Sequence, residues 1–209
     1  MKQYRAIIFD CGGVIFHFSP HKVFDHWAMA SGKDANSLEH KFEFGKTFKE
    51  FERGEIDAVV FRDRIMEMLD LKLSDEDFDN GWNSLYGGLV PGIEELLQDL
   101  KTHYRLVALT NTNEIHAKKW RIICAPLLHF FEKVFSSHEI HARKPEPKAY
   151  EIVLKHLNLA TDKVIFLDDN PEFVSAAAAK NIESIHVTSF SQMVRALRNL
   201  GVEVAASHG

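Results

Sequence analysis

The sequence predicts an α/β fold: a parallel sheet sandwiched by helices, with an all-helical segment inserted after the first strand. Short apolar runs that end in polar residues alternate with longer stretches in which apolar residues recur every three or four positions. Such alternation is typical of parallel strands joined by right-handed helical crossovers. The one long interruption follows the first apolar run and shows helical periodicity only. It indicates an inserted subdomain rather than a further part of the sheet.

The composition is that of a globular protein with a sizeable core. The chain has 209 residues, of which 45% are hydrophobic and 16 are phenylalanine. Its 25 basic and 30 acidic residues give a net charge of -5, so we expect neither a nucleic-acid partner nor an anionic membrane partner. Two cysteines without zinc-like or disulfide-like spacing favour a reducing, cytoplasmic location. No apolar stretch approaches membrane-spanning length, so we expect neither a signal peptide nor an anchor.

The first predicted strand is the apolar run 6–9, which is short and continuous, as in strands buried on both faces. It ends at Asp10, and Gly12 and Gly13 follow. Paired glycines let the backbone turn sharply and approach a ligand. Cys11 stands beside Asp10, but alternation along the strand would turn its side chain away from that carboxylate. Taken alone, the turn is equally compatible with an ordinary strand end.

Helical spacing governs the next stretch. One helix is predicted around residues 23–30, and its spacing continues as far as Phe51. A second helix starts at about Asp57, and Ser74 resembles the cap of a third. No convincing strand is found here. The predicted domains are therefore a helical cap of residues 16–88 and a core of residues 1–15 and 89–209, with hinges near Phe16 and Gly88.

Strand and helix alternate again after residue 90. A helix is predicted from Pro91, and another from Pro171 with Asn170 as its cap. The tail from residue 205 to residue 209 is expected to lack regular structure. Further strands are predicted at 105–109, 133–135, 164–167 and 184–187, with helices between them and at the end of the chain.

The carboxyl ends of parallel strands lie along one edge of a sheet, and polar side chains stand at three of these ends. Two acids can hold a hard divalent cation such as Mg²⁺ through oxygen. A hydroxyl, a main-chain amide and an ammonium can neutralise the oxygens of a phosphoryl group, which leaves one acid to attack. The residues gathered at this edge are Asp10, Thr110, Asn111, Asp168 and Asp169, with Lys144 reaching in from a loop.

Together these residues resemble those of the haloacid dehalogenase (HAD) superfamily of phosphohydrolases, and the resemblance runs over nearly the whole chain. It implies a HAD-like Rossmannoid core with the helical insertion as its cap. The segments that resemble the α-D-glucose-1-phosphate phosphatase group more narrowly are 51–56, 81–82, 110–113, 143–146 and 168–170.

The resemblance implies a role for each catalytic position. Asp10 would be the nucleophile that becomes an aspartyl-phosphate. Thr110 and Asn111 would hold the phosphate group of the substrate, and Lys144 would bridge that phosphate and the nucleophile.

The resemblance also implies a Mg²⁺ site. Asp10 and Asp169 would bind the ion through their carboxylates, and Asp168 would be a neighbouring ligand or an orienter of the metal's water. Gly12 would contribute its main-chain carbonyl oxygen.

Gly12 is also the one departure from the superfamily. Most of its phosphatases carry a second aspartate at this position, which acts as general acid and then as general base. General acid–base help is worth about 10²-fold to 10⁴-fold, so its loss slows turnover without abolishing it. An anomeric oxygen leaves more readily than an ordinary alkoxide, and the glucose-1-phosphate group shares the glycine. We therefore expect a Mg²⁺-dependent phosphatase of a small phosphorylated metabolite, a sugar phosphate such as glucose 1-phosphate.

Three alternatives remain. A haloacid dehalogenase also uses a strand-end aspartate, but its chemistry needs no metal. A non-catalytic phosphosugar-binding protein is possible if Gly12 marks decay. A response-regulator receiver has a similar set of acids and a lysine, but the different order of these residues along the chain and the helical insertion count against it. The physiological ester, the pathway and the oligomeric state are not predicted.

Overall fold

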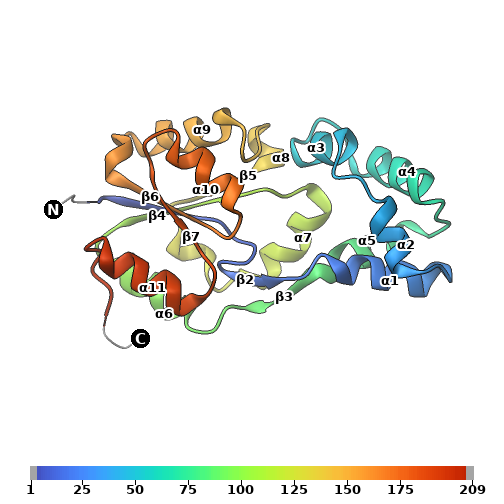
Figure 1. Ribbon diagram of the computed structural model, residues 1–209, viewed down its shortest axis with the longest axis horizontal. Helices are drawn as coiled ribbons and strands as arrows, with labels where there is room; N and C mark the ends of the chain where they lie inside the picture. The colour runs from blue at the N-terminus through green and yellow to red at the C-terminus, as the bar shows by residue number, and fades with distance from the viewer. Residues whose placement is uncertain (1–3, 206–209) are drawn as a thin grey trace.

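A computed structural model describes residues 4–205 and contains a five-stranded parallel sheet flanked by helices (Figure 1). The strand order is β5-β4-β1-β6-β7, so β1 lies at the centre. This confirms the predicted α/β class. The strands are β1 (Ala6–Phe9), β4 (Arg105–Thr110), β5 (Lys133–Ser136), β6 (Val164–Asp168) and β7 (Glu183–His186).

Two hydrophobic clusters form the core, one on each face of the sheet. Along β1, Ile7 and Phe9 point to one cluster, and Ala6 and Ile8 point to the other. The first cluster is covered by α6 (Ile93–Leu100), α7 (Glu114–Ile123) and α11 (Phe190–Asn199), and the second by α8 (Ser137–Ile140), α9 (Pro147–Leu157) and α10 (Pro171–Ala178).

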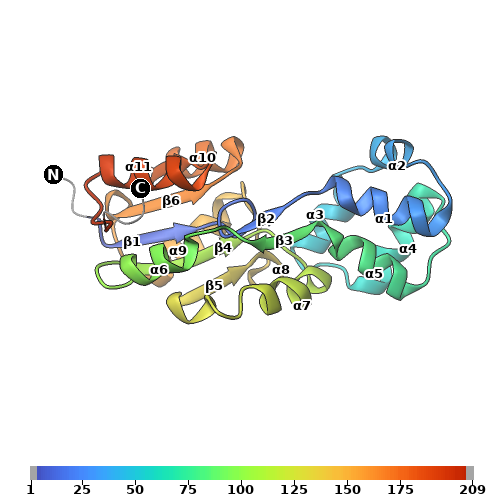
Figure 2. The same cartoon turned by 90° about the horizontal axis from the view of Figure 1, so that it is seen from below.

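A second group of helices lies beyond the carboxyl end of the sheet (Figures 1 and 2). It has its own aromatic cluster around Trp27, Phe61 and Phe78. Two predicted helix starts are confirmed here, because the side chains of Asp57 and Ser74 accept hydrogen bonds from main-chain N–H groups three residues on. We call this group the cap helices: α1 (His21–Ser31), α2 (Ala35–Lys41), α3 (Lys46–Glu52), α4 (Ala58–Leu69) and α5 (Asp75–Trp82).

The expectation that residues 16–88 contain no strand is wrong. β2 (Phe16–Phe18) and β3 (Tyr86–Leu89) form a two-stranded antiparallel ribbon between the cap helices and the sheet. The sequence concealed it because the strands are short and β3 contains two glycines, which weaken strand propensity. Only the pairing of these distant segments makes them strands.

The predicted extents of two helices are also wrong. The helical spacing that begins near residue 23 does not continue to Phe51, because α1 ends at Gly32 in the left-handed conformation and α2 and α3 follow as separate helices. The helix predicted from Pro91 begins at Ile93, after Gly92 with φ 85°. Three 3₁₀ turns complete the described elements: η1 (Asn83–Leu85), η2 (Leu128–Phe130) and η3 (Thr161–Lys163).

None of the helices described between residues 4 and 205 is both long and apolar enough to cross a membrane. The prediction for the tail concerns residues that lie, except for Ala205, outside the described part of the chain.

Candidate active site

The predicted residues meet at the carboxyl end of the central strand. Asp10 directly follows β1, and its N–H donates to the Leu167 carbonyl oxygen at 2.8 Å. Thr110 ends β4 and Asp168 ends β6, the two strands that flank β1. Three strand ends that are far apart in the sequence therefore present their side chains at one point.

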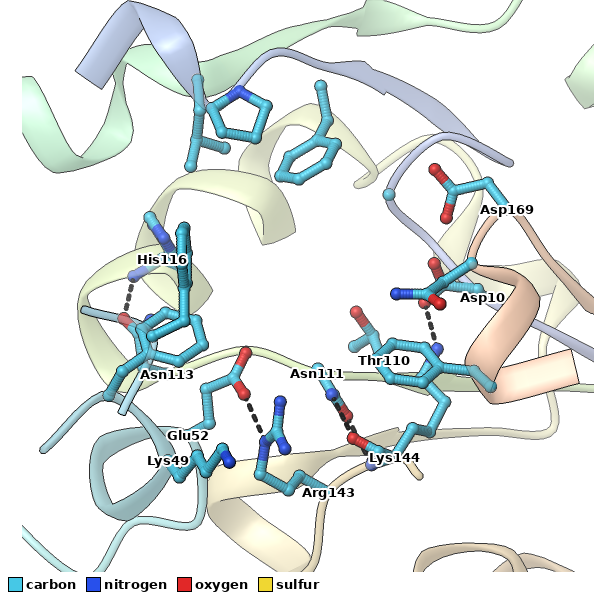
Figure 3. Close-up of a pocket in the computed structure, with 18 of the residues that line it drawn as sticks. Asp10, Lys49, Glu52, Thr110, Asn111, Asn113, His116, Arg143, Lys144 and Asp169 are labelled. Carbon is cyan, nitrogen blue, oxygen red and sulfur yellow. Dashed lines mark hydrogen bonds and ion pairs between the residues drawn. The ribbon is translucent and has the colours of Figure 1, made fainter. Parts of the chain in front are cut away.

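Lys144 lies at the centre of the site. Its Nζ donates to Asp10 Oδ1 at 2.7 Å (Figure 3). It also donates to Asp168 Oδ2 at 2.5 Å, and the lysine side chain is 1% exposed. Oδ1 of Asp168 accepts from the N–H of Asn170 at 2.8 Å. Asp168 is thus occupied by the lysine and by the turn after β6. Its position fits an orienting role better than that of a freely offered metal ligand.

Asn111 holds the main chain of Lys144. Its Nδ2 donates to the Lys144 carbonyl oxygen at 2.8 Å, and its Oδ1 accepts from the Lys144 N–H at the same distance. This pair of hydrogen bonds ties the end of β4 to the loop that carries the lysine. The side chain of Asn111 therefore positions the main chain of Lys144.

The buried charges shift one another's protonation. Burial raises the pKa of Asp10 to about 7; Asp168 and Asp169 add to the rise and Lys144 opposes it. Burial and the neighbouring Asp168 likewise raise the pKa of Asp169. Burial lowers the pKa of Lys144, but the charges of Asp10 and Asp168 outweigh it, so the lysine pKa is raised and the ammonium persists. The site holds more acid than the lysine alone can balance.

Those surplus carboxylates fit a divalent cation. One oxygen from each of Asp10, Asp168 and Asp169 lies within 4.8 Å of the others, an oxygen-only set of the kind that Mg²⁺ prefers. Among the described residues, the histidines and cysteines do not enter such a group. Positive charge here would favour the ionised form of Asp10 and Asp169, which burial disfavours.

The two glycines of the turn after Asp10 differ in whether the surrounding space could accept a side chain. Gly13 has φ 72°, and a Cβ there would overlap the carboxylate of Asp169. A Cβ on Gly12 would make only ordinary contacts, the nearest being 3.8 Å from the ring of Phe18. The buried Cys11 belongs to the apolar cluster beneath the sheet, as alternation predicted, and it is not part of the site.

Contacts that the sequence did not reveal tie the cap helices to the Lys144 loop. Arg143 Nε donates to Glu52 Oε2 at 2.6 Å, and both side chains are largely buried. Arg53 Nη1 donates to Glu146 Oε1 at 2.8 Å. The sequence shows only that charged residues flank both Phe51 and Lys144. It does not indicate which of these residues form ion pairs with one another.

A cavity of about 830 Å³ opens above these residues. Figure 3 shows Asp10, Asp169 and Lys144 on one side of it, and Glu52 and His116 across from them. The cavity is far larger than a phosphate group needs, so most of it is available to the rest of a substrate.

Comparison with known proteins places this site in a family. A sequence model described as haloacid dehalogenase-like hydrolase matches residues 4–181, and the chain therefore belongs to that family of hydrolases. The family membership that the motifs predicted is confirmed, whereas the glucose-1-phosphate phosphatase group is not specifically shown.

Three similar curated proteins are phosphatases. The D-ribitol-5-phosphate phosphatase of Bacteroides thetaiotaomicron is 23% identical over 79% of this chain and 82% of its own length. The phosphorylated carbohydrates phosphatase of Thermotoga maritima is 26% identical over 87% and 84%. A sesquiterpene phosphatase of Aspergillus oryzae is 29% identical over 94% and 96%.

Solved structures share the fold, and one of them contains magnesium. A HAD family enzyme of Bacteroides thetaiotaomicron, in complex with magnesium and inorganic phosphate, is 26% identical and has a TM-score of 0.77 over 89% of this chain and 95% of that one. A HAD-like family hydrolase of Porphyromonas gingivalis, 20% identical, shares the fold with a TM-score of 0.82 over 96% and 99%. Magnesium, the cofactor expected from the sequence, is thus the metal of a similar enzyme, and the carboxylates here fit it.

Proposed function

We propose that this hydrolase is a Mg²⁺-dependent phosphatase that cleaves a small phosphate monoester through an aspartyl-phosphate intermediate on Asp10. The observation that carries the proposal is the contact of one buried ammonium, Lys144, with both Asp10 and Asp168. A buried ammonium beside the nucleophile offsets part of the negative charge that a dianionic phosphate meets on entry. The phosphatase names of three relatives support the same reaction.

In the first step, a carboxylate oxygen of Asp10 forms a bond to phosphorus while the bond from phosphorus to the ester oxygen breaks. The departing oxygen takes the electron pair and then a proton from water, because Gly12 offers no acid. Lys144, the Thr110 hydroxyl and the main-chain N–H of Asn111 hold the phosphoryl oxygens. When bound by Asp10, Asp169 and the Gly12 carbonyl, Mg²⁺ supplies further positive charge to these oxygens.

In the second step, a water oxygen bonds to phosphorus, and the bond between phosphorus and Asp10 breaks with its electrons returning to the carboxylate. The products are inorganic phosphate and free Asp10. The protons released by the water pass to phosphate and solvent. No side chain at position 12 accepts a proton from the attacking water. The second step therefore relies on the positively charged and hydrogen-bonding groups that hold the phosphoryl oxygens.

The sequence predicted a sugar phosphate as the monoester, and glucose 1-phosphate is the compound that tests this prediction. Without a general acid, the rate depends on how readily the ester oxygen leaves, which favours the anomeric phosphate over a 6-phosphate. The relatives named for D-ribitol 5-phosphate and for phosphorylated carbohydrates support a polyol or sugar, and the relative named for a sesquiterpene does not. The relatives therefore agree on the phosphate and differ in what carries it.

Phosphate release from p-nitrophenyl phosphate and from a panel of metabolite monophosphates tests the proposal. We expect Mg²⁺-dependent release by the wild type, none by Asp10→Asn, and normal release by Asp63→Asn, an exposed matched control. Release that continues in excess chelator would contradict the metal requirement. Chloride release from 2-chloropropionate without metal would point to the dehalogenase instead, and tight phosphosugar binding without single-turnover hydrolysis would point to the binding protein.

A further inference from the structure

The cavity changes character away from the phosphate end. Asp10, Lys144 and Asp169 mark one end, and aromatic side chains from the cap helices and from the loop between α2 and α3 line much of the rest. Phe16 and Phe18 of the β2–β3 ribbon lie beside Gly12, next to the phosphate end. The aromatic residues of this lining from the cap helices, that loop and the ribbon are Phe16, Phe18, Phe24, Phe42, Phe44, Phe48, Trp82 and Tyr86.

Five of these rings contact one another in one continuous cluster, namely Phe24, Phe42, Phe44, Phe48 and Trp82. Phe44 lies 4.9 Å from Phe42 and 5.1 Å from Phe48 between ring centroids, and Phe42 lies 5.9 Å from Trp82. Two of the rings remain open to solvent, because Phe44 is 59% exposed and Phe18 is 45% exposed. Phe44 therefore continues the buried aromatic lining of the cavity as far as solvent.

The polar side chains at this end are mostly paired with one another. Glu52 receives Arg143, and Oδ1 of Asn113 caps α7 by accepting from the His116 N–H at 3.0 Å. The ring Nδ1 of His116 lies 3.1 Å from Asn83 Oδ1. A site that selects a sugar presents unpaired donors and acceptors to its hydroxyls, since each hydroxyl gives up water on entry. Among the described lining residues on the cap side, Lys49 of α3 offers an exposed ammonium, and few neutral donors or acceptors are left for hydroxyls.

We infer that the leaving-group part of this cavity selects apolar phosphate monoesters, the phosphates of phenols and similarly acidic aromatic alcohols, over sugar phosphates. The inference rests on the proposed phosphatase function and names its substrate class. A phenolic ester would satisfy Gly12 as well, because a phenol, with a pKa of about 10, is a far better leaving group than an alcohol. The aromatic surface then replaces water around the substrate and gains its free energy from that burial.

Binding of alkylphosphonates tests the inference without any leaving group, because their carbon–phosphorus bond is not hydrolysed. Ethyl-, butyl- and hexylphosphonate would be titrated calorimetrically into the wild-type protein at saturating Mg²⁺. Each added methylene should tighten binding about threefold to fourfold while it meets the aromatic surface. A dissociation constant that stays flat along the series, or tighter binding of glucose 1-phosphate than of hexylphosphonate, would overturn the inference.

Phe44→Ser provides the matching variant. Because Phe44 is exposed, its loss spares the fold, and it should reduce the preference for hexyl- over ethylphosphonate by about fivefold or more. Met29→Ser removes an apolar side chain that is 87% exposed and lies outside the cavity lining, and the preference should stay at the wild-type value. Equal effects of the two variants would count against the aromatic surface.

Failure of the proposed function gives a different result. If the chain releases phosphate from no ester, including p-nitrophenyl phosphate, the phosphatase reaction is wrong whatever the binding series shows. If phosphate is released but the binding series is flat, the reaction stands and the apolar specificity is wrong.

Discussion

The Asp169 carboxylate lies where a side chain on Gly13 would have to be. Gly13 adopts φ 72°, and a Cβ on it would overlap Asp169 Oδ2. Position 13 therefore needs glycine twice over, for its backbone conformation and for the space that the carboxylate fills. The turn that follows Asp10 packs directly against the Asp169 side chain in the turn after β6. The positions of Asp10 and Asp169 relative to each other therefore depend on this contact.

Gly13→Ala should therefore abolish Mg²⁺-dependent activity, because Asp169 must move and the ion loses a ligand. Gly12→Ala should keep activity within about threefold, because its Cβ meets nothing closer than 3.8 Å and its φ is not positive. A Mg²⁺ titration of phosphate release for both variants checks this. Similar losses at the two positions would show that the backbone turn, and not the contact with Asp169, is what matters.

Gly12→Asp should supply the missing acid, since the space at this position accepts a Cβ. In the wild type, kcat/KM should fall steeply as the leaving-group pKa rises, so that glucose 1-phosphate outruns glucose 6-phosphate. The variant should flatten this dependence by improving the poorer leaving groups about 10²-fold. Aryl phosphates of graded acidity provide the measurement. Equal wild-type rates on both glucose esters would show that leaving-group acidity does not govern the reaction.

Gly54→Ala tests the contact between the cap helices and α8, the short helix that precedes the Lys144 loop. Gly54 has φ 63°, and a Cβ there would overlap the carbonyl oxygen of His138. Gly201→Ala is the matched control, with a similar φ of 79° and open space around it. Both should lose about 1 to 2 kcal/mol of stability from the left-handed backbone, and only Gly54→Ala should also lower kcat/KM. Thermal unfolding and p-nitrophenyl phosphate kinetics separate the two effects.

His116 should make the stability depend on pH. Burial lowers its pKa from the ordinary 6.5 to about 3. Between these values the unfolded chain binds a proton that the folded chain does not, so stability is complete above pH 6.5 and falls as the pH is lowered toward 3. From pH 6.5 to pH 5 the loss should be about 2 kcal/mol. Between pH 6.5 and pH 5, the free energy of unfolding measured with urea should fall by about 2 kcal/mol less in His116→Gln than in the wild type. An equal fall in the two proteins would refute the assignment.

The elements that the sequence predicted correctly are those that produce a recognisable pattern over a few consecutive residues. The runs 6–9 and 164–167 are continuously apolar because β1 and β6 are covered on both faces, and burial along them is complete. Helix starts at Asp57 and Ser74 were visible because a cap acts within three residues. The convergence of Asp10, Thr110 and Asp168 followed from parallel topology alone.

What the sequence could not supply are relations between distant residues. The Asn111 side chain is of a type that can bind phosphate, yet its carboxamide makes hydrogen bonds to the main chain of Lys144. That pairing depends on how two loops are arranged in space. The ion pair between Glu52 and Arg143 likewise exists only because the cap helices lie against the core. Neither contact leaves a periodicity or a short-range motif that a single sequence displays.

The β2–β3 ribbon also bears on how the chain folds. β1 and β4 are neighbours in the sheet although residues 10–104 lie between them. Once β2 and β3 pair, the two ends of the segment that carries the cap helices lie side by side. The connection that remains to be closed between β1 and β4 is then short, whatever the length of the inserted segment. Loop-closure entropy rises by only about 0.6 kcal/mol for each doubling of loop length. The central strand pair is therefore nearly indifferent to how many residues the insertion contains, and this position can accept larger or smaller insertions without rebuilding the sheet.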